Sequence, residues 1–229
     1  YGMKDIVIED LLKHVEAGDL IIDGGNSFYK DTDRRMEYLK KKKIAFLGMG
    51  VSGGAKGARL GPSIMPGGTK GAFNKVKKIL ESVSAKVNGE PCVAYMGKGS
   101  AGNYVKMVHN GIEYAMMQLL AESYDILKTI GRLNNQELHE AYVKYNRGKL
   151  KSFLVEITAA IFRKEDDLSK SMLIDIILDK AKQKGTGKWT SQNAMDFGIP
   201  VPTIDAAVTM RGLSSLKAER LEASQILKV

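Results

Sequence analysis

The stretch from Gly99 to Gly131 constrains the fold of this chain more than any other part of the sequence. It has no proline after Gly102, and its apolar residues recur at intervals of three, four and one, which is the spacing of a buried helical face. These apolar positions are Val105, Val108, Ile112, Met116, Leu119 and Leu120. The pattern predicts one long helix over residues 102–130.

Polar residues share one face of this predicted helix, because positions three, four and seven apart lie on the same side. They are Lys106, His109, Asn110 and Glu113. Together they offer a base, an acid and two hydrogen-bonding groups over roughly 10 Å of helix. A solvated polar stripe is the simpler interpretation. Gly111 favours a functional one, because a glycine inside a helix costs about 1 kcal/mol and suits a place where another group approaches the backbone closely.

Before residue 98, strand signals alternate with helix signals, and after it the strand signals stop. We expect strands at 19–23, 44–47, 63–65 and 92–95, and helices at 4–17, 31–42 and 69–83, the last capped by Thr69. Later helices are expected at 135–146, 151–162, 171–183, 188–197, 203–211 and 214–227. The fold class is therefore α/β followed by all-α: a partial doubly wound parallel sheet (Rossmann-like) over 1–98, then a helical domain over 99–229.

Two glycine-containing loops follow predicted strands. Asn26 lies just beyond the strand at 19–23, at the carboxyl end where open α/β sheets bind ligands. Residues 48–53 match the dinucleotide fingerprint G-x-G-x-x-G, but we reject the match for two reasons. The segment that should open a helix runs through Gly57 to Gly61 and Pro62, and no acidic residue follows at about 20 positions, where a ribose partner is expected. Backbone N–H groups of Ser52, Gly53 and Gly54 are still able to cradle an anionic oxygen.

Composition excludes several classes of protein. The net charge of +9 suits a small polyanionic ligand, but the lysines lack the interleaved aromatic residues of a single-strand nucleic-acid platform. No apolar run is long enough to span a membrane. The single cysteine, Cys92, fits a reducing compartment, so we place the protein in the cytosol. The three histidines, His14, His109 and His139, do not form a metal-binding pattern.

Five stretches resemble the 6-phosphogluconate dehydrogenase family of the pentose phosphate pathway. They are residues 106–114, 23–27, 51–54, 61–68 and 184–190. The resemblance covers nearly the whole chain, although both ends look cut short relative to the family. It implies oxidation of 6-phosphogluconate by NADP, loss of CO2 and formation of ribulose 5-phosphate, in a homodimer. For this chain alone we expect weak or absent turnover.

The resemblance also implies a role for each site residue. Lys106 is the expected base and Glu113 the expected acid, and neither role needs a metal. The expected substrate contacts are Asn26, Ser52, Gly53, Gly54, His109, Asn110, Tyr114, Lys188 and Arg211, with the phosphate near Tyr114, Lys188 and Arg211. Asn26 and Lys188 are also expected to contact the cofactor. Without the resemblance, His109 reads as a buried structural histidine, Tyr114 as core, and the glycines before Lys188 as a helix C-cap.

Some positions depart from the family pattern. The chain has Ala55 and Lys56 in place of an acidic pair, Asn103 in place of histidine, and Ala115 and Met116 in place of Gly-Asp. Two other readings stay open. One is a β-hydroxyacid dehydrogenase relative, which shares a helix lysine. The other is a non-catalytic subunit that binds substrate or serves assembly.

Overall fold

The computed structural model describes residues 3–227, and the chain divides between Asn110 and Gly111 into two compact units. The first contains α1 (Met3–Leu11), β1 (Leu20–Asp23), α2 (Tyr29–Lys41), β2 (Ala45–Ser52), α3 (Gly54–Leu60), β3 (Ser63–Gly68), α4 (Lys70–Val83), β4 (Lys86–Val87), β5 (Glu90–Pro91) and the start of α5 (Ala101–Asp125). The second contains the rest of α5, a π-helical turn (Ile126–Ile130), α6 (Asn135–Asn146), α7 (Phe153–Ile161), α8 (Leu173–Ile176), α9 (Thr186–Asp196), α10 (Pro202–Ser215) and α11 (Lys217–Ile226). An α/β start followed by helices is the fold class expected from the sequence.

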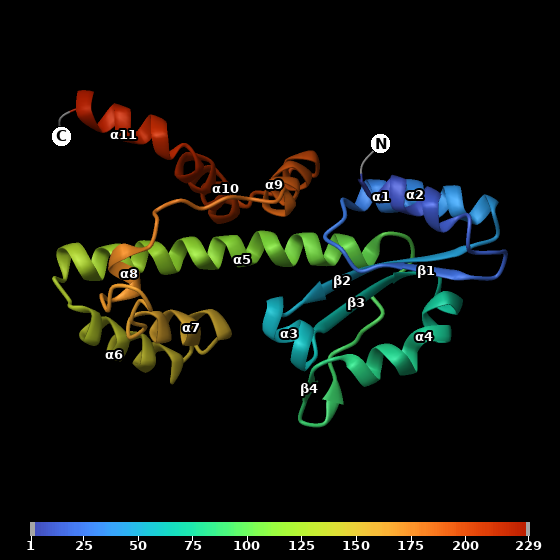
Figure 1. Ribbon diagram of the computed structural model, residues 1–229, viewed down its shortest axis with the longest axis horizontal. Coiled ribbons are helices and arrows are strands. Elements are labelled where there is room, and N and C mark those ends of the chain that lie inside the picture. Colours follow the sequence, from blue (N-terminus) through green and yellow to red (C-terminus); the bar gives the residue numbers. More distant parts are fainter. Residues whose placement is uncertain (1–2, 228–229) are drawn as a thin grey trace. The chain divides into compact units, whose positions relative to one another are not determined.

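The first unit is built on a sheet in the order β1-β2-β3, with α1 and α2 on one face and α4 on the other (Figure 1). Side chains of a strand alternate between the two faces, and β2 follows this rule. Phe46 joins the cluster of Ile8 and Leu39, whereas Leu47 joins the cluster of Phe73 and its neighbours on α4. The sheet is therefore covered on both sides.

The direction of β3 differs from the prediction. β1 and β2 are parallel, as expected, but β2 and β3 are antiparallel, with Ser52 opposite Ser63. The expected strand at 92–95 is not a regular strand, but its segment runs parallel to β3. Val93 bridges Ile64 and Gly97 bridges Gly67, and the Ile64 N–H donates to the Cys92 carbonyl at 2.9 Å. The small hairpin of β4 and β5 was not predicted.

Most predicted helices are present with bounds close to those expected. Thr69 caps α4 as predicted, its hydroxyl accepting from the Ala72 N–H at 3.2 Å. The predicted long helix begins at Ala101 and its last turn is π-helical. The predicted buried face of this helix was wrong, because Val105, Ile112, Met116 and Leu119 are exposed. Two predictions were wrong in extent: α1 ends at Leu11 instead of running to 17, and the helix expected at 171–183 is only the four residues of α8.

The core of the second unit lies between α5 and the hairpin of α6 and α7. Tyr142 and Phe162 of this hairpin pack against Leu120 and Tyr124 of α5. Among the described residues, no helix combines the length and the apolar character that a membrane span requires.

Glycines seat the start of α5 directly on the sheet. A Cβ atom on Gly102 would lie 2.3 Å from the carbonyl oxygens of Gly48 and Met65, and one on Gly50 would lie 2.5 Å from Cβ of Lys106. Real Cβ atoms do not approach so closely, so larger residues would push the helix off the strands. The glycines at 48 and 50 therefore lie inside a strand and serve helix packing. One reason for rejecting the dinucleotide fingerprint was wrong, because the helix α3 does open directly after this segment.

Candidate active site

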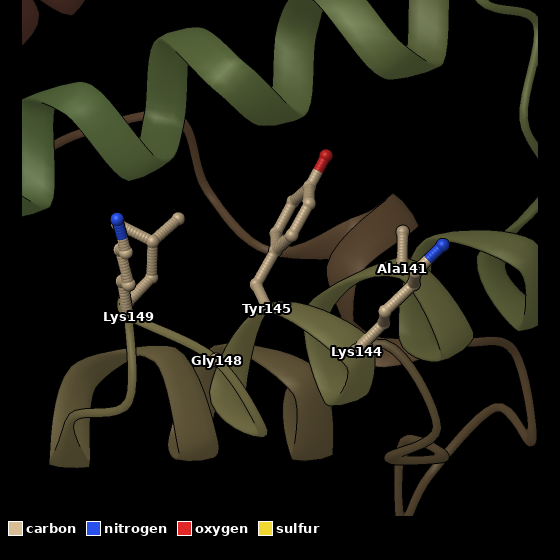
Figure 2. A pocket seen from close by; sticks show the side chains of 6 residues that line it. Ala141, Lys144, Tyr145, Gly148 and Lys149 are labelled. Atoms are coloured by element: carbon tan, nitrogen blue, oxygen red, sulfur yellow. The ribbon is translucent and has the colours of Figure 1, made fainter.

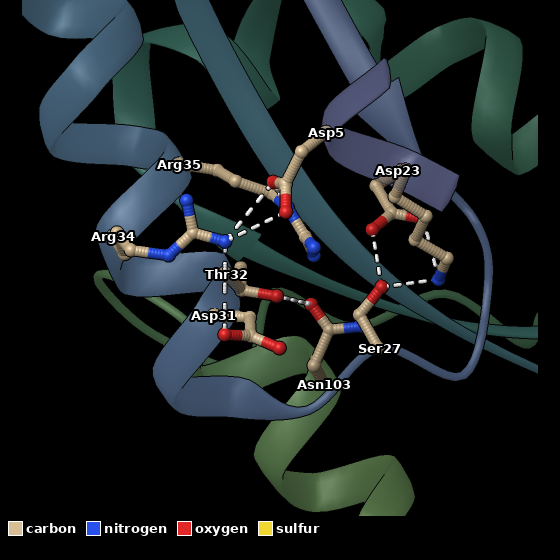
Figure 3. A network of polar contacts seen from close by, with 9 residues as sticks. Asp5, Asp23, Ser27, Asp31, Thr32, Arg34, Arg35 and Asn103 are labelled. Carbon is tan, nitrogen blue, oxygen red and sulfur yellow. Dashed lines mark hydrogen bonds and ion pairs between the residues drawn. The ribbon is translucent and has the colours of Figure 1, made fainter. Parts of the chain in front are cut away.

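The loop after β1 carries the first candidate residue, Asn26, whose side chain is exposed. Its neighbours are fixed on both sides. The Gly25 N–H donates to Asp23 Oδ1 at 2.9 Å, and the Ser27 N–H donates to the Gly25 carbonyl at 2.8 Å. The Ser27 hydroxyl contacts Asp23 and the Lys4 ammonium (Figure 3). Asn26 is therefore presented to solvent by an ordered loop at the carboxyl end of a strand, where ligands bind in α/β sheets.

The second candidate loop joins β2 to α3. Gly53 and Gly54 are exposed and adopt φ values of +142° and +57°, which side chains disfavour. A Cβ on Gly53 would also lie 2.8 Å from the backbone of Gly57. Ser52 ends β2 and is half-buried. The glycines of this loop are thus required by its backbone, whatever it binds.

Lys106 is buried, which is unusual for a lysine: the residue is only 6% exposed. Its Nζ lies 3.4 Å from Nδ1 of His109, and the same ring nitrogen lies 3.2 Å from Oδ1 of Asn110. Nδ1 has one hydrogen-bonding position, so it either accepts from a lysine ammonium or, in its protonated tautomer, donates to the amide oxygen.

In the second unit, Gly111 has the close neighbour that the sequence predicts. A Cβ there would lie 2.7 Å from Oγ1 and Cγ2 of Thr190 on α9. Thr190 is buried, and its hydroxyl donates to the Thr186 carbonyl at 2.9 Å. Gly111 therefore lets α9 pack directly on α5.

Tyr114, Gly187 and Arg211 form one cluster, brought together from α5, α9 and α10. A Cβ on Gly187 would lie 2.6 Å from Cδ2 of the Tyr114 ring. The guanidinium of Arg211 stacks on the same ring, with Cζ 3.8 Å from the ring centroid, and donates to the Lys182 carbonyl at 2.9 Å. The other arm of the guanidinium, Nη2, donates to Sδ of Met117 at 3.7 Å, so Arg211 has a fixed position.

Lys188 lies in the first turn of α9 with its side chain exposed. Gly185 is the N-cap residue of this helix, and its φ is +104°. The interpretation of these glycines as a C-cap was therefore wrong, because they start a helix instead of ending one.

Glu113 is half-buried, seven residues after Lys106 on the continuous α5. Helical periodicity puts these two side chains on one face of that helix.

Sequence reasoning missed three residues that hold the candidate residues in place. Thr190 and Gly187 do so in the second unit, and Asn103, at 2% exposure, does so in the first. The signal for close packing was the pair of glycines just before Lys188, Gly185 and Gly187. Residues 3–227 contain no group of three or more His, Cys, Asp or Glu side chains arranged to hold a metal ion.

A cavity of about 460 Å³ lies elsewhere in the second unit (Figure 2). It is lined by Ala141, Lys144, Tyr145, Gly148, Lys149 and Leu150. None of the candidate residues lines it.

Comparison with known proteins gives one consistent family. Residues 3–97 match the model of the NAD binding domain of 6-phosphogluconate dehydrogenase, and residues 102–229 match that of its C-terminal domain. A "6-phosphogluconate dehydrogenase, NADP(+)-dependent, decarboxylating" of Bacillus subtilis is 56% identical over 97% of this chain and 48% of its own length. A decarboxylating 6-phosphogluconate dehydrogenase of Saccharomyces cerevisiae is 53% identical over 97% of this chain and 45% of its own length.

Solved structures agree. The Plasmodium falciparum 6-phosphogluconate dehydrogenase, described in apo form and with its cofactor NADP+ and its substrate 6-phosphogluconate, is 53% identical with a TM-score of 0.91, covering 98% of this chain and 48% of its own. A 3-hydroxyisobutyrate dehydrogenase of Salmonella typhimurium is 16% identical with a TM-score of 0.66, over 94% of this chain and 71% of its own, and shows likeness of fold alone. The chain spans about half the length of the curated relatives it matches. By its match to the family model over residues 102–229, this chain belongs to the 6-phosphogluconate dehydrogenase family.

Proposed function

We propose that this chain binds 6-phosphogluconate and takes part in its oxidative decarboxylation to ribulose 5-phosphate. The observation that carries the proposal is the buried Lys106 beside His109, on the same helix as Glu113. A lysine needs a special reason to be 6% exposed. Proton transfer to and from a defined substrate atom is such a reason. The reaction itself is inferred from the names of relatives that are more than 50% identical to this chain.

Each step of the reaction needs a proton moved at a fixed place. NADP would supply the acceptor for the hydride that leaves C3 of the substrate. Lys106, as the neutral amine, takes the proton from the C3 hydroxyl; as the ammonium, it polarises the C3 carbonyl while CO2 leaves. Glu113 then protonates C1 of the enediol. His109 and Asn110 orient the substrate hydroxyls and carboxylate through hydrogen bonds.

The two ends of the substrate have separate binding residues in this proposal. The backbone of Ser52, Gly53 and Gly54 accommodates the carboxylate end. Tyr114, Lys188 and Arg211 receive the phosphate. The stacked Arg211 supports this assignment, because a guanidinium held by its neighbours loses little freedom when it binds phosphate oxygens.

NADP is the proposed cofactor, with Asn26 and Lys188 as its contacts in this chain. The ordered loop at the carboxyl end of β1 fits a dinucleotide site, since such sites lie beyond the carboxyl ends of strands. The exposed Lys188 offers an ammonium to a phosphate or a carboxamide.

We also propose that residues 1–98 and 99–229 are the two domains, that the protein works in the cytosol and that it is a homodimer. The family models leave residues 98–101 between their matches, which supports the domain boundary. Sedimentation equilibrium tests the dimer, and a monomer at high concentration would argue against it.

Calorimetric titration tests the substrate. We expect 6-phosphogluconate to bind and gluconate, which lacks the phosphate, to bind at least about tenfold more weakly. Lys188→Ala is expected to remove most of this preference, and Lys184→Ala, a change of another exposed lysine just before α9, to preserve it. Equal binding of the two sugar acids would contradict the proposal.

A further inference from the structure

Asn103 on α5 joins three segments of the first unit through its side-chain amide. It is 2% exposed. Its Oδ1 accepts from the Thr32 hydroxyl on α2 at 3.1 Å, and its Nδ2 donates to the Gly25 carbonyl in the loop after β1 at 3.2 Å. Figure 3 shows Asn103 between Thr32 and the loop that contains Ser27.

The orientation of this amide follows from its partners. A backbone carbonyl only accepts hydrogen bonds, so the NH2 group must face Gly25. The amide oxygen then faces Thr32, which donates its hydroxyl proton. Both ends of the buried amide are satisfied in this orientation alone, so the side chain has one preferred position.

Gly48 in β2 makes room for this arrangement. A Cβ at that position would lie 2.2 Å from Asn103 Oδ1 and 2.6 Å from Cγ2 of Thr32. The first glycine of the rejected fingerprint therefore has a defined purpose, which is to admit the bonded pair of Thr32 and Asn103. The pair is therefore held by packing against β2 as well as by its hydrogen bonds.

The hydrogen bond from Asn103 to Gly25 lies close in sequence to two candidate site residues. Gly25 immediately precedes the exposed Asn26, and Asn103 lies one helical turn before Lys106. We propose that Asn103 is a positioning residue for ligand binding, which holds the Gly24–Asn26 loop against α5 so that Asn26 keeps a fixed place relative to Lys106. This inference rests on the proposed function, in which both residues touch substrate. Asn103 itself is too deeply buried for direct contact.

Ser100 provides a matched control. Like Asn103, Ser100 is buried and bonds to α2, but it lies just before the start of α5. Its N–H and hydroxyl donate to the Asp33 carboxylate at 2.9 and 2.8 Å. Its side chain thus reaches Asp33 and not the loop. Ser100→Ala therefore removes a hydrogen bond between α2 and the start of α5 but leaves the hydrogen bond to Gly25 in place.

The first readout is amide hydrogen exchange of Ser27, whose N–H donates to the Gly25 carbonyl. Asn103→Ala is expected to speed this exchange about tenfold, the effect of one lost buried hydrogen bond. Ser100→Ala is expected to change the exchange rate of Ser27 by less than about twofold, which is well below the effect of losing one hydrogen bond. This readout needs no ligand.

The second readout is the affinity for 6-phosphogluconate. Asn103→Ala is expected to weaken it about tenfold and Ser100→Ala by less than about twofold. Asn103→Asp adds a rescue test. At pH 8 the carboxylate only accepts and cannot bond to the Gly25 carbonyl, whereas a protonated carboxyl can donate to it. Burial raises the pKa of a carboxyl, so lowering the pH to 5 increases the protonated fraction. The affinity ratio of this variant to the unchanged chain should therefore recover at the lower pH.

The outcomes separate the two proposals. Unchanged Ser27 exchange in Asn103→Ala, or an equal loss of affinity in Ser100→Ala, would overturn the role of Asn103. Absence of 6-phosphogluconate binding by the unchanged chain would instead overturn the proposed function, and the exchange result would still decide whether Asn103 holds the loop.

Discussion

The guanidinium of Arg211 lies against the ring of Tyr114, with Cζ 3.8 Å from the ring centroid. The stack joins α10 to α5, and the Lys182 carbonyl fixes the far end of the guanidinium at 2.9 Å. A cation over an aromatic face contributes about 0.5–2 kcal/mol, depending on its exposure. The position of Arg211 is therefore set before any phosphate arrives.

Arg211→Lys should lower both the stability of the second unit and the affinity for 6-phosphogluconate. Lysine keeps the charge but loses the planar stack and the fork, so we expect a loss of about 1 kcal/mol in unfolding free energy and about tenfold weaker binding. Denaturant unfolding and calorimetry measure the two effects. Tyr114→Phe is the control, because the ring remains. It should keep the stability and lower affinity only through the lost hydroxyl.

Gly111→Ala should destabilise the protein although alanine favours helices. The added methyl would lie 2.7 Å from Thr190, so α9 must shift, at a cost of about 1–3 kcal/mol. Gly212 lies in α10, where an added methyl would meet nothing within 4 Å, so Gly212→Ala should stabilise by about 0.5–1 kcal/mol. Urea unfolding of both variants measures this. Equal effects of the two changes would show that the contact between Gly111 and Thr190 is unimportant.

Asp179 gives a pH-dependent contact between the loop before α9 and the helix α11. The Lys217 ammonium, and then the Arg220 guanidinium, lower the pKa of its carboxyl from 3.8 to about 2. Because the folded-state pKa is below the unfolded one, the contact stabilises α11 above about pH 4 and is lost as the pH falls through about 2. Carbon NMR of the carboxyl measures the midpoint. Lys217→Met should move it upward, and an unmoved midpoint would contradict this assignment.

How much of the fold was predictable depended on whether the determining contacts were local. The helix at 135–146 was predicted with its true bounds, and the local reason is a capping box between Asn134 and Glu137. The helix expected at 171–183 stops at Ile176, because the apolar residues beyond it, such as Leu178 (67% exposed), find no packed surface. Periodicity alone does not reveal that.

The direction of β3 was a different kind of error. The predicted strands at 44–47 and 63–65 left residues 48–62 between them, which is enough for a parallel crossover. In the structure β2 continues to Ser52, so only residues 53–62 remain, and the pairing is antiparallel. In the site, the close approach at Gly111 was predicted, but its partner Thr190 lies far along the chain. The role of Asn103 depends on Thr32 and Gly25 meeting in space, which no spacing rule indicates.

The most direct test of the proposed chemistry is a coupled assay of this chain with 6-phosphogluconate and NADP, following NADPH and CO2 together. We predict weak turnover that forms the two products in equal amounts. Lys106→Met and Glu113→Gln should each lower it by at least about a hundredfold, since each removes a proton-transfer group. NADPH without CO2 would favour the β-hydroxyacid dehydrogenase reading, and turnover that survives both substitutions would contradict the assigned chemistry.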